Sequence, residues 1–231
     1  MDTTVSLSPH ISSESKNAAS LKSFWLGLSI LVIGFFPLSR LGFLWMSDRL
    51  TANPILFVEQ QLGLASLDML VLSLAVTPLV TLTGWRSLSD SRRILGLFAF
   101  FYFALHFLAF SVLDYGSDWL EILRLVIEKP FLWIGLVAGS ILAALTITSS
   151  RYWMKRMGKS WKLLHKSIYL AAGLIILHYA YAVKGSLFTL GGDLVRPLWM
   201  SLLIAVLLLF RIPLVKRWIS SLRSRFPIFG R

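Results

Sequence analysis

The chain of 231 residues is 56% hydrophobic, contains no cysteine and carries a formal net charge of +12. The lack of cysteine excludes disulfides, thiolate metal sites, iron–sulfur clusters and cysteine nucleophiles, so any redox chemistry needs a bound cofactor. The hydrophobic residues lie in long blocks, which predict membrane helices rather than a soluble core. In such a protein the positive charge indicates cytoplasmic loops and anionic membrane lipid, and not nucleic-acid binding.

The succession of polar and apolar segments along the chain predicts an all-α integral membrane protein. Residues 1–22 are polar and Ser-rich, and we expect them to form a disordered cytoplasmic tail. Residues 23–213 contain six apolar blocks, which predict a six-transmembrane-helix bundle, and the basic residues 214–231 predict a second cytoplasmic tail. At a rise of about 1.5 Å per residue each block can cross the hydrocarbon core, the last one only barely. The blocks are Phe24–Leu44, Gly63–Thr83, Ile94–Leu113, Phe131–Thr148, Leu163–Val183 and Pro197–Ile212.

The charges between the blocks predict the orientation. Counted together, the two ends of the chain, residues 84–93 and residues 149–162 hold sixteen Lys and Arg and three acids, whereas the opposite loops hold similar numbers of acids and bases. The positive-inside rule then places both termini in the cytoplasm, which agrees with an even number of crossings.

Asp68 falls inside the second block, where a carboxylate costs free energy and is a functional candidate by default. The alternative is that Asp68 reaches the membrane interface or pairs with a base such as Arg49. Lys166 lies close enough to the cytoplasmic edge for its ammonium to extend out of the membrane.

Three histidines lie in the third and fifth blocks, and a fourth, His10, lies in the tail. His106 is about 18 Å and His178 about 22 Å from the inner ends of their helices, so both are expected at the same depth in the outer half of the membrane. Two neutral imidazoles from facing helices can hold a haem iron. His106 and His178 are therefore predicted to ligate a haem b in an electron-transfer protein.

His165 lies near the inner end of the fifth block, and the residue at matching depth on the third block is Arg92. These two residues are predicted to hold a second haem, with His165 as a metal ligand. Arg stays protonated and is a poor iron ligand, so Arg92 is expected to contact a propionate. The sequence leaves open whether one or two haems bind. On an ideal helix His165 and His178 face about 140° apart, so this helix is either distorted or irregular in its first turn.

Gly135 and Gly139 form a small-xxx-small pattern, which is interpreted first as a helix-packing motif. We find no nucleotide-binding loop and no nucleophile–base pair.

Two alternatives to the haem subunit stay open. One is another haem-containing ferric or quinone reductase. The other is a proton-coupled transporter or membrane-assembly factor, in which the histidines and Asp68 would relay protons without haem.

At these residues the sequence resembles the MsrQ (YedZ) family of the ferric-reductase-like transmembrane superfamily. The match covers roughly residues 24–215, and Gln60 and Asp68 lie among its departures from the family pattern. The matching stretches are Asn53-Pro54, Thr77-Pro78-Leu79, Arg92-Arg93-Ile94-Leu95-Gly96-Leu97 through His106, Glu128-Lys129-Pro130-Phe131, Gly158-Lys159-Ser160-Trp161, and Leu163-Leu164-His165-Lys166-Ser167-Ile168-Tyr169 through His178-Tyr179.

The resemblance implies a specific role in the bacterial inner membrane. MsrQ proteins are haem-binding electron-transfer subunits, not independent enzymes. They are thought to pass electrons from the quinone pool to MsrP, a periplasmic molybdopterin subunit that reduces methionine sulfoxide in oxidised proteins. FMN has also been associated with the family. Three family histidine positions correspond to His106, His165 and His178, and the fourth superfamily position is occupied by Arg92, as in other MsrQ proteins.

Overall fold

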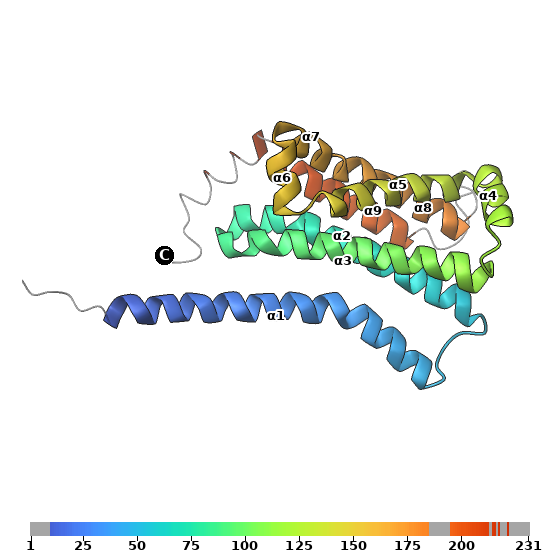
Figure 1. Ribbon diagram of the computed structural model, residues 1–231, viewed down its shortest axis with the longest axis horizontal. Helices are drawn as coiled ribbons and strands as arrows, with labels where there is room; N and C mark the ends of the chain where they lie inside the picture. The colour runs from blue at the N-terminus through green and yellow to red at the C-terminus, as the bar shows by residue number, and fades with distance from the viewer. Residues whose placement is uncertain (1–9, 185–194, 213, 216, 218–220, 222–231) are drawn as a thin grey trace, which may run out of the picture.

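A computed structural model describes residues 10–184, 195–212, 214, 215, 217 and 221. This described part is helical and contains no strand, and Figure 1 shows its helices running side by side along the long axis. In chain order the elements are α1 (His10–Met46), α2 (Pro54–Thr83), η1 (Arg86–Asp90), α3 (Ser91–Leu108), the π-helical η2 (Ala109–Asp114), α4 (Trp119–Glu128), α5 (Pro130–Ile147), α6 (Arg151–Met157), α7 (Lys159–Lys166), α8 (Ile168–Lys184) and α9 (Val195–Leu209).

Local sequence signals determine where the central helices begin and end. The Asn53 side chain accepts a hydrogen bond from the backbone N–H of Leu56, and Pro54 occupies the first helical position of α2. Both features favour a helix start. The same helix ends at Gly84, which has a φ of 79° and so adopts the left-handed conformation that glycine tolerates best. Pro130 likewise begins α5.

The predicted membrane helices are confirmed in position, but the six-helix count is not. Five segments are long and apolar enough to cross a membrane: Ser23–Met46, Pro54–Thr83, Arg86–Asp114, Pro130–Ile147 and Lys159–Val183. The helix α9 is apolar but shorter, with 15 residues. Residues 10–22, which we expected to be disordered, are helical and extend α1, whereas residues 1–9 and most of the predicted C-terminal tail lie outside the described residues.

Two helix pairs form the centre of the bundle. The closest packing is between α2 and α3 and between α5 and α8, and α3 joins the pairs by also contacting α5. The helix α9 packs against α8 and α2. In Figure 1 the long α1 runs beside α2 and α3 and bends along its length, and Pro37 lies inside it. Proline removes a backbone hydrogen bond and is a common cause of such bends.

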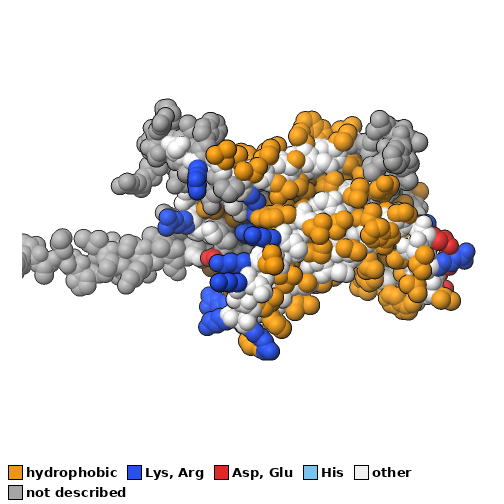
Figure 2. Space-filling view, turned by 90° about the horizontal axis from the view of Figure 1, so that it is seen from above, with side chains coloured by type: hydrophobic (Ala, Val, Ile, Leu, Met, Phe, Trp, Pro, Cys, Tyr) orange, Lys and Arg blue, Asp and Glu red, His pale blue; other side chains and the backbone are white. Residues whose placement is uncertain are grey.

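The surface agrees with a membrane location. Hydrophobic side chains cover the middle of the face shown in Figure 2, while Lys and Arg gather at one end of the described part. Many large apolar side chains are exposed, among them Phe36 and Leu170, and such a surface suits lipid rather than water.

Three local features differ from or refine the predictions. The helix α4 was not predicted, because its ten residues are too few to span a membrane and carry charges. The block Leu163–Val183 is interrupted at Ser167, between α7 and α8, which confirms the distortion that was one of the two alternatives for this helix. Asp68 is partly buried on α2, and Arg196 at the start of α9 is a base that acts on it electrostatically.

Candidate cofactor site

Two histidines from different helix pairs meet in the centre of the bundle. His106 lies on α3 and His178 on α8, and both are partly buried. Their ring centres are 6.3 Å apart and their planes make an angle of 78°. The proximity expected from their matched depths is therefore observed, because α3 and α8 each bring one imidazole to the same level.

Each imidazole is anchored by a backbone carbonyl of the other helix in its own pair. The Nδ1 of His106 lies 2.9 Å from the Glu59 carbonyl oxygen on α2, and the Nδ1 of His178 lies 2.7 Å from the Phe131 carbonyl oxygen on α5. A carbonyl oxygen only accepts hydrogen bonds, so Nδ1 must carry the proton in both rings. In the neutral imidazole this leaves the Nε2 lone pair free in both residues, which is the tautomer that a metal ligand needs.

The spacing of the two rings fits an iron held between them. With a metal–imidazole nitrogen bond of about 2 Å and about 1.1 Å from that nitrogen to the ring centre, two opposed ligands would have centres about 6 Å apart. The observed 6.3 Å agrees with this value.

The donor set favours a macrocycle over a bare metal ion. Within the described ranges of the chain, no group of three or more His, Cys, Asp or Glu side chains could hold a metal. A bare ion needs three or four protein ligands, whereas a haem iron has four ring nitrogens and requires only axial ligands. Two imidazoles with ring centres 6.3 Å apart, and no third such ligand among the described residues, therefore fit haem.

Aromatic and small residues surround the pair. The Phe131 ring lies 5.9 Å from the His178 ring, and Tyr102, one turn before His106, is completely buried. A Cβ added at Gly139 would overlap the ring of Phe103, and one added at Gly135 would lie 2.7 Å from the His178 Nδ1. The Gly135-x-x-x-Gly139 pattern thus accommodates two side-chain rings, and not only a neighbouring helix backbone.

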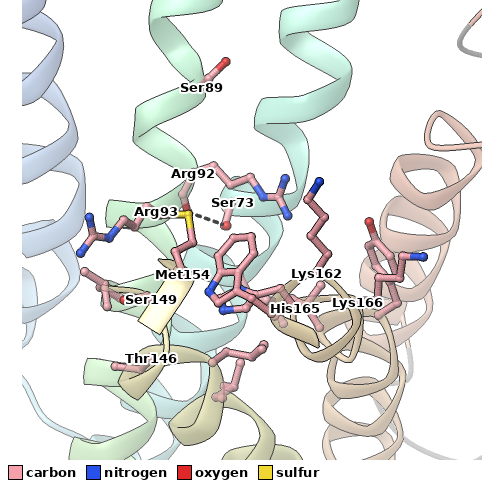
Figure 3. A pocket seen from close by; sticks show the side chains of 18 residues that line it. Ser73, Ser89, Arg92, Arg93, Thr146, Ser149, Met154, Lys162, His165 and Lys166 are labelled. Carbon is pink, nitrogen blue, oxygen red and sulfur yellow. Dashed lines mark hydrogen bonds between the residues drawn. The ribbon is translucent and has the colours of Figure 1, made fainter. Parts of the chain in front are cut away.

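A second candidate site lies at the basic end of the bundle. A cavity of about 370 Å³ is lined by residues of α2, α3, α5, α7 and α8. It contains the second predicted pair, because both Arg92 and His165 line it. Figure 3 shows Arg92 and Lys162 extending towards the same region, whereas Arg93 extends the other way. This cavity does not include His106 or His178, so the two predicted pairs form separate sites.

His165 is held by its neighbours in a way that differs from the central histidines. Its Nε2 lies 3.2 Å from the Thr148 hydroxyl, and its ring stacks on Trp161 with centres 4.0 Å apart. The indole N–H of Trp161 donates to the Thr148 carbonyl at 2.8 Å, which fixes the stack. With Nε2 engaged by Thr148, His165 presents its stacked ring beside the cations of this cavity.

The charge at this second site is strongly positive. Lys162 and Lys166 join Arg92, Arg93 and His165 in the cavity lining, which includes no Asp or Glu. Arg211, which follows α9, adds a further cation that acts electrostatically on Arg92. A planar molecule that carries phosphate or carboxylate groups matches this combination of cations and aromatic rings.

A group of acids lies at the opposite end of the bundle. The phenol of Tyr115 has its pKa raised by partial burial and by the carboxylates of Asp114, Glu59 and Glu121. Three acids therefore gather near the end of the bundle where His106 and His178 lie.

Sequence reasoning identified the four cofactor candidates but not their supports. The Glu59 and Phe131 carbonyls belong to the backbone, so no side-chain pattern marks them. The involvement of Trp161 and Thr148 depends on how the segment that contains α6 connects α5 to α7, which residue spacing does not determine.

Comparison with known proteins identifies relatives over most of the chain. The family described as ferric reductase like transmembrane component matches residues 62–176. The protein-methionine-sulfoxide reductase heme-binding subunit MsrQ of Bordetella parapertussis is 39% identical over 183 residues, covering 79% of this chain and 86% of the relative. The protein of the same name from Herminiimonas arsenicoxydans is 39% identical over 184 residues, with 79% and 82% covered.

A third MsrQ, from Xanthomonas axonopodis pv. citri, is 36% identical over 199 residues, which covers 83% of this chain and 88% of the relative. No solved structure matches the chain. The apolar spans, the match to the ferric-reductase-like component and the similarity over most of both chains establish that this multi-pass membrane protein belongs to the MsrQ family.

Proposed function

We propose that the chain is the haem-binding membrane subunit of a periplasmic methionine sulfoxide reductase and passes electrons from the quinone pool to a soluble catalytic partner. The central observation is the pair formed by His106 and His178, with ring centres 6.3 Å apart and each Nδ1 committed to a backbone carbonyl. The relatives, whose name describes a heme-binding subunit of protein-methionine-sulfoxide reductase, support the same role.

In this proposal His106 and His178 would hold a haem b. When bound, the haem would supply a one-electron ferric–ferrous couple, which no side chain of this cysteine-free protein supplies. The chain provides ligands of fixed tautomer, because each Nδ1 proton is held by a carbonyl. The surrounding α2, α3, α5 and α8 provide an apolar environment that limits solvent access and tunes the redox potential.

The inner cavity is the proposed site of a second cofactor, held by His165 and Arg92. Its volume of about 370 Å³ lies within the range of small-molecule sites. The stacked rings of Trp161 and His165 suit a flat molecule, and Arg92 and Lys162 suit its acidic groups. Both a second haem, through its propionates, and FMN, through its phosphate, have this shared chemistry, and haem would also take His165 as a ligand after release from Thr148.

The proposed location is the bacterial inner membrane with both termini in the cytoplasm. The end of the bundle that carries the cavity with Arg92 and Lys162 then faces the cytoplasm. The end that carries Glu59, Asp114 and Glu121 faces the periplasm, where the molybdopterin subunit MsrP would dock near the haem. Quinol would reach the chain from the lipid.

The decisive experiment is a reduced-minus-oxidised visible spectrum of the detergent-purified protein with pyridine-haem quantification. We expect a b-type spectrum in the wild type and loss of the central haem's contribution to it in His106→Ala and His178→Ala. His165→Ala is the matched control, because it removes an imidazole from the inner site only. Full haem content and an unchanged spectrum in either central variant would show that the ligand assignment is wrong.

Two further measurements separate the proposal from its alternatives. Pyridine-haem and flavin content together determine whether the inner site holds a second haem, FMN or neither. Reconstitution with a quinol and MsrP tests the electron route. Another ferric or quinone reductase would contain haem without reducing MsrP, and a proton-coupled transporter would purify colourless after expression with adequate haem supply.

A further inference from the structure

Two glycines in the middle of helices lie directly against the two central histidines. A Cβ added at Gly63 on α2 would lie 3.2 Å from the His106 Nδ1, and one added at Gly135 on α5 would lie 2.7 Å from the His178 Nδ1. Glycine inside a helix costs about 0.5–1 kcal/mol relative to alanine, so helix stability does not explain either residue. Their contacts point to a role towards the imidazoles.

The two glycines occupy equivalent positions in the two helix pairs. Gly63 follows the acceptor residue Glu59 by four residues, and Gly135 follows the acceptor residue Phe131 by four residues. In both pairs the acceptor also precedes its histidine by 47 residues. The same anchor is therefore built twice, once from α2 and α3 and once from α5 and α8.

The four-residue spacing has a physical reason. In an α-helix the carbonyl of one residue accepts the N–H of the residue four positions later, so Gly63 and Gly135 supply the helical donors to these two carbonyls. A carbonyl oxygen has two lone pairs and can accept a second donor if that donor can reach it. A side chain at the donor residue would occupy the space that each imidazole now uses.

Other glycines show that this contact is specific. A Cβ at Gly173 on α8 would meet nothing within 4 Å, and one at Gly96 on α3 would make only an ordinary contact of 3.7 Å with the Ser73 hydroxyl. A Cβ at Gly34 would overlap the Phe98 ring, which is a packing contact between α1 and α3 that involves neither histidine.

We propose that Gly63 and Gly135 are positioning residues for the axial ligands of the haem. By lacking a Cβ, each glycine lets an imidazole donate its Nδ1 proton to the carbonyl four residues earlier and present its Nε2 to the iron. This inference rests on the proposed haem site. The hydrogen bond from Nδ1 increases the basicity of the ligand, which stabilises ferric iron and lowers the midpoint potential.

The test compares Gly63→Ala and Gly135→Ala with the control Gly173→Ala in the purified, haem-containing protein. Haem content, the low-temperature EPR spectrum of the ferric form and the midpoint potential are measured in the same detergent. We expect haem affinity to fall on the order of ten-fold, a changed bis-imidazole EPR signal and a raised midpoint potential in the first two variants. Gly135→Ala should have the larger effect, because its contact distance is shorter.

The outcomes separate this inference from the proposed function. A wild-type protein without haem would refute the haem site itself. Haem-containing wild type with an unchanged EPR signal, potential and haem content in both Gly63→Ala and Gly135→Ala would overturn the positioning role alone. Gly34→Ala is the packing control, and we expect it to lower stability without changing the EPR signal. If Gly135→Ala does not accumulate, Gly63→Ala carries the test, because His106 needs to move only slightly there.

Discussion

The Arg211 guanidinium donates a hydrogen bond of 2.9 Å to the Leu74 carbonyl, which lies on a different helix 137 residues earlier. The N–H of residue 78 would normally pair with that carbonyl, but residue 78 is proline and has no N–H. Arg211 therefore satisfies a carbonyl that Pro78 leaves unpaired in α2. Its other terminal nitrogen donates to the Tyr169 hydroxyl at 2.8 Å, so one side chain connects the end of α9 with α2 and α8.

We predict that Arg211→Ala destabilises the protein by about 1–3 kcal/mol, because it leaves the Leu74 carbonyl without a partner inside the membrane. The matched comparison is the same substitution made together with Pro78→Ala, which restores a helical N–H for that carbonyl. Thermal unfolding of the four proteins in detergent gives a double-mutant cycle. Equal losses from Arg211→Ala with and without Pro78 would contradict the account.

Tyr102 provides a second case of a side chain that replaces helical hydrogen bonding. Its hydroxyl donates to the Gly34 carbonyl at 2.6 Å and accepts from the Leu38 N–H at 3.3 Å, so it lies between two groups that would otherwise pair within α1. We predict that Tyr102→Phe lowers stability by about 1–3 kcal/mol and alters the bend near Pro37. Unfolding followed by tryptophan fluorescence measures the loss, and Tyr152→Phe, at an exposed position, is the control. A loss no larger than that of the control would mean that α1 recovers its own hydrogen bond.

Much of the architecture follows from the sequence because membrane helices satisfy their own backbone hydrogen bonds. A block of apolar residues is then enough to locate α2, α3 and α5 to within a few residues, except at the start of α2. The helical rise alone also gave the matching depth of His106 and His178. Depth constrains distance in a bundle, because helices that cross the same membrane bring residues of equal depth to one level.

Other features do not follow from periodicity. The anchoring carbonyls of Glu59 and Phe131 depend on which helices pair, and that pairing is a tertiary property. The interruption at Ser167 turns His165 towards Trp161 and Thr148, a contact that the ideal-helix angle could not predict. Helix α4 was missed because a short amphipathic segment between long apolar blocks resembles a loop.

The buried Ser66 should contribute less to stability than Arg211, although its side chain also bridges two helices. The Ser66 hydroxyl on α2 donates to the Ala99 carbonyl on α3 at 2.8 Å. That carbonyl keeps its own helical donor, the N–H of Phe103, when the hydroxyl is removed. We therefore predict that Ser66→Ala costs about 0.6 kcal/mol, the average for interhelical hydrogen bonds in membranes. Unfolding measurements on Ser66→Ala and on the exposed Ser140→Ala test this, and a loss as large as that of Arg211→Ala would show that packing around Ser66 dominates.

The inner site offers a comparison between two adjacent arginines. Arg92 and Arg93 both line the cavity, but their guanidinium groups extend in opposite directions, and only that of Arg92 extends towards Lys162 (Figure 3). We predict that Arg92→Gln lowers the content of the inner cofactor, because it removes a cation from the place where propionate or phosphate would bind. The central haem, whose ligands are His106 and His178, should keep its spectrum. Pyridine-haem and released-flavin assays measure both cofactors in the same sample.

Arg93→Gln is the control, because it removes the same positive charge as Arg92→Gln from the neighbouring residue of α3. We expect it to leave cofactor content close to that of the wild type. The same loss in both variants would mean that the overall positive charge of this end, and not the Arg92 guanidinium, retains the cofactor. A loss confined to Arg92→Gln and shared by His165→Ala would assign both residues to one inner site, as their common cavity suggests.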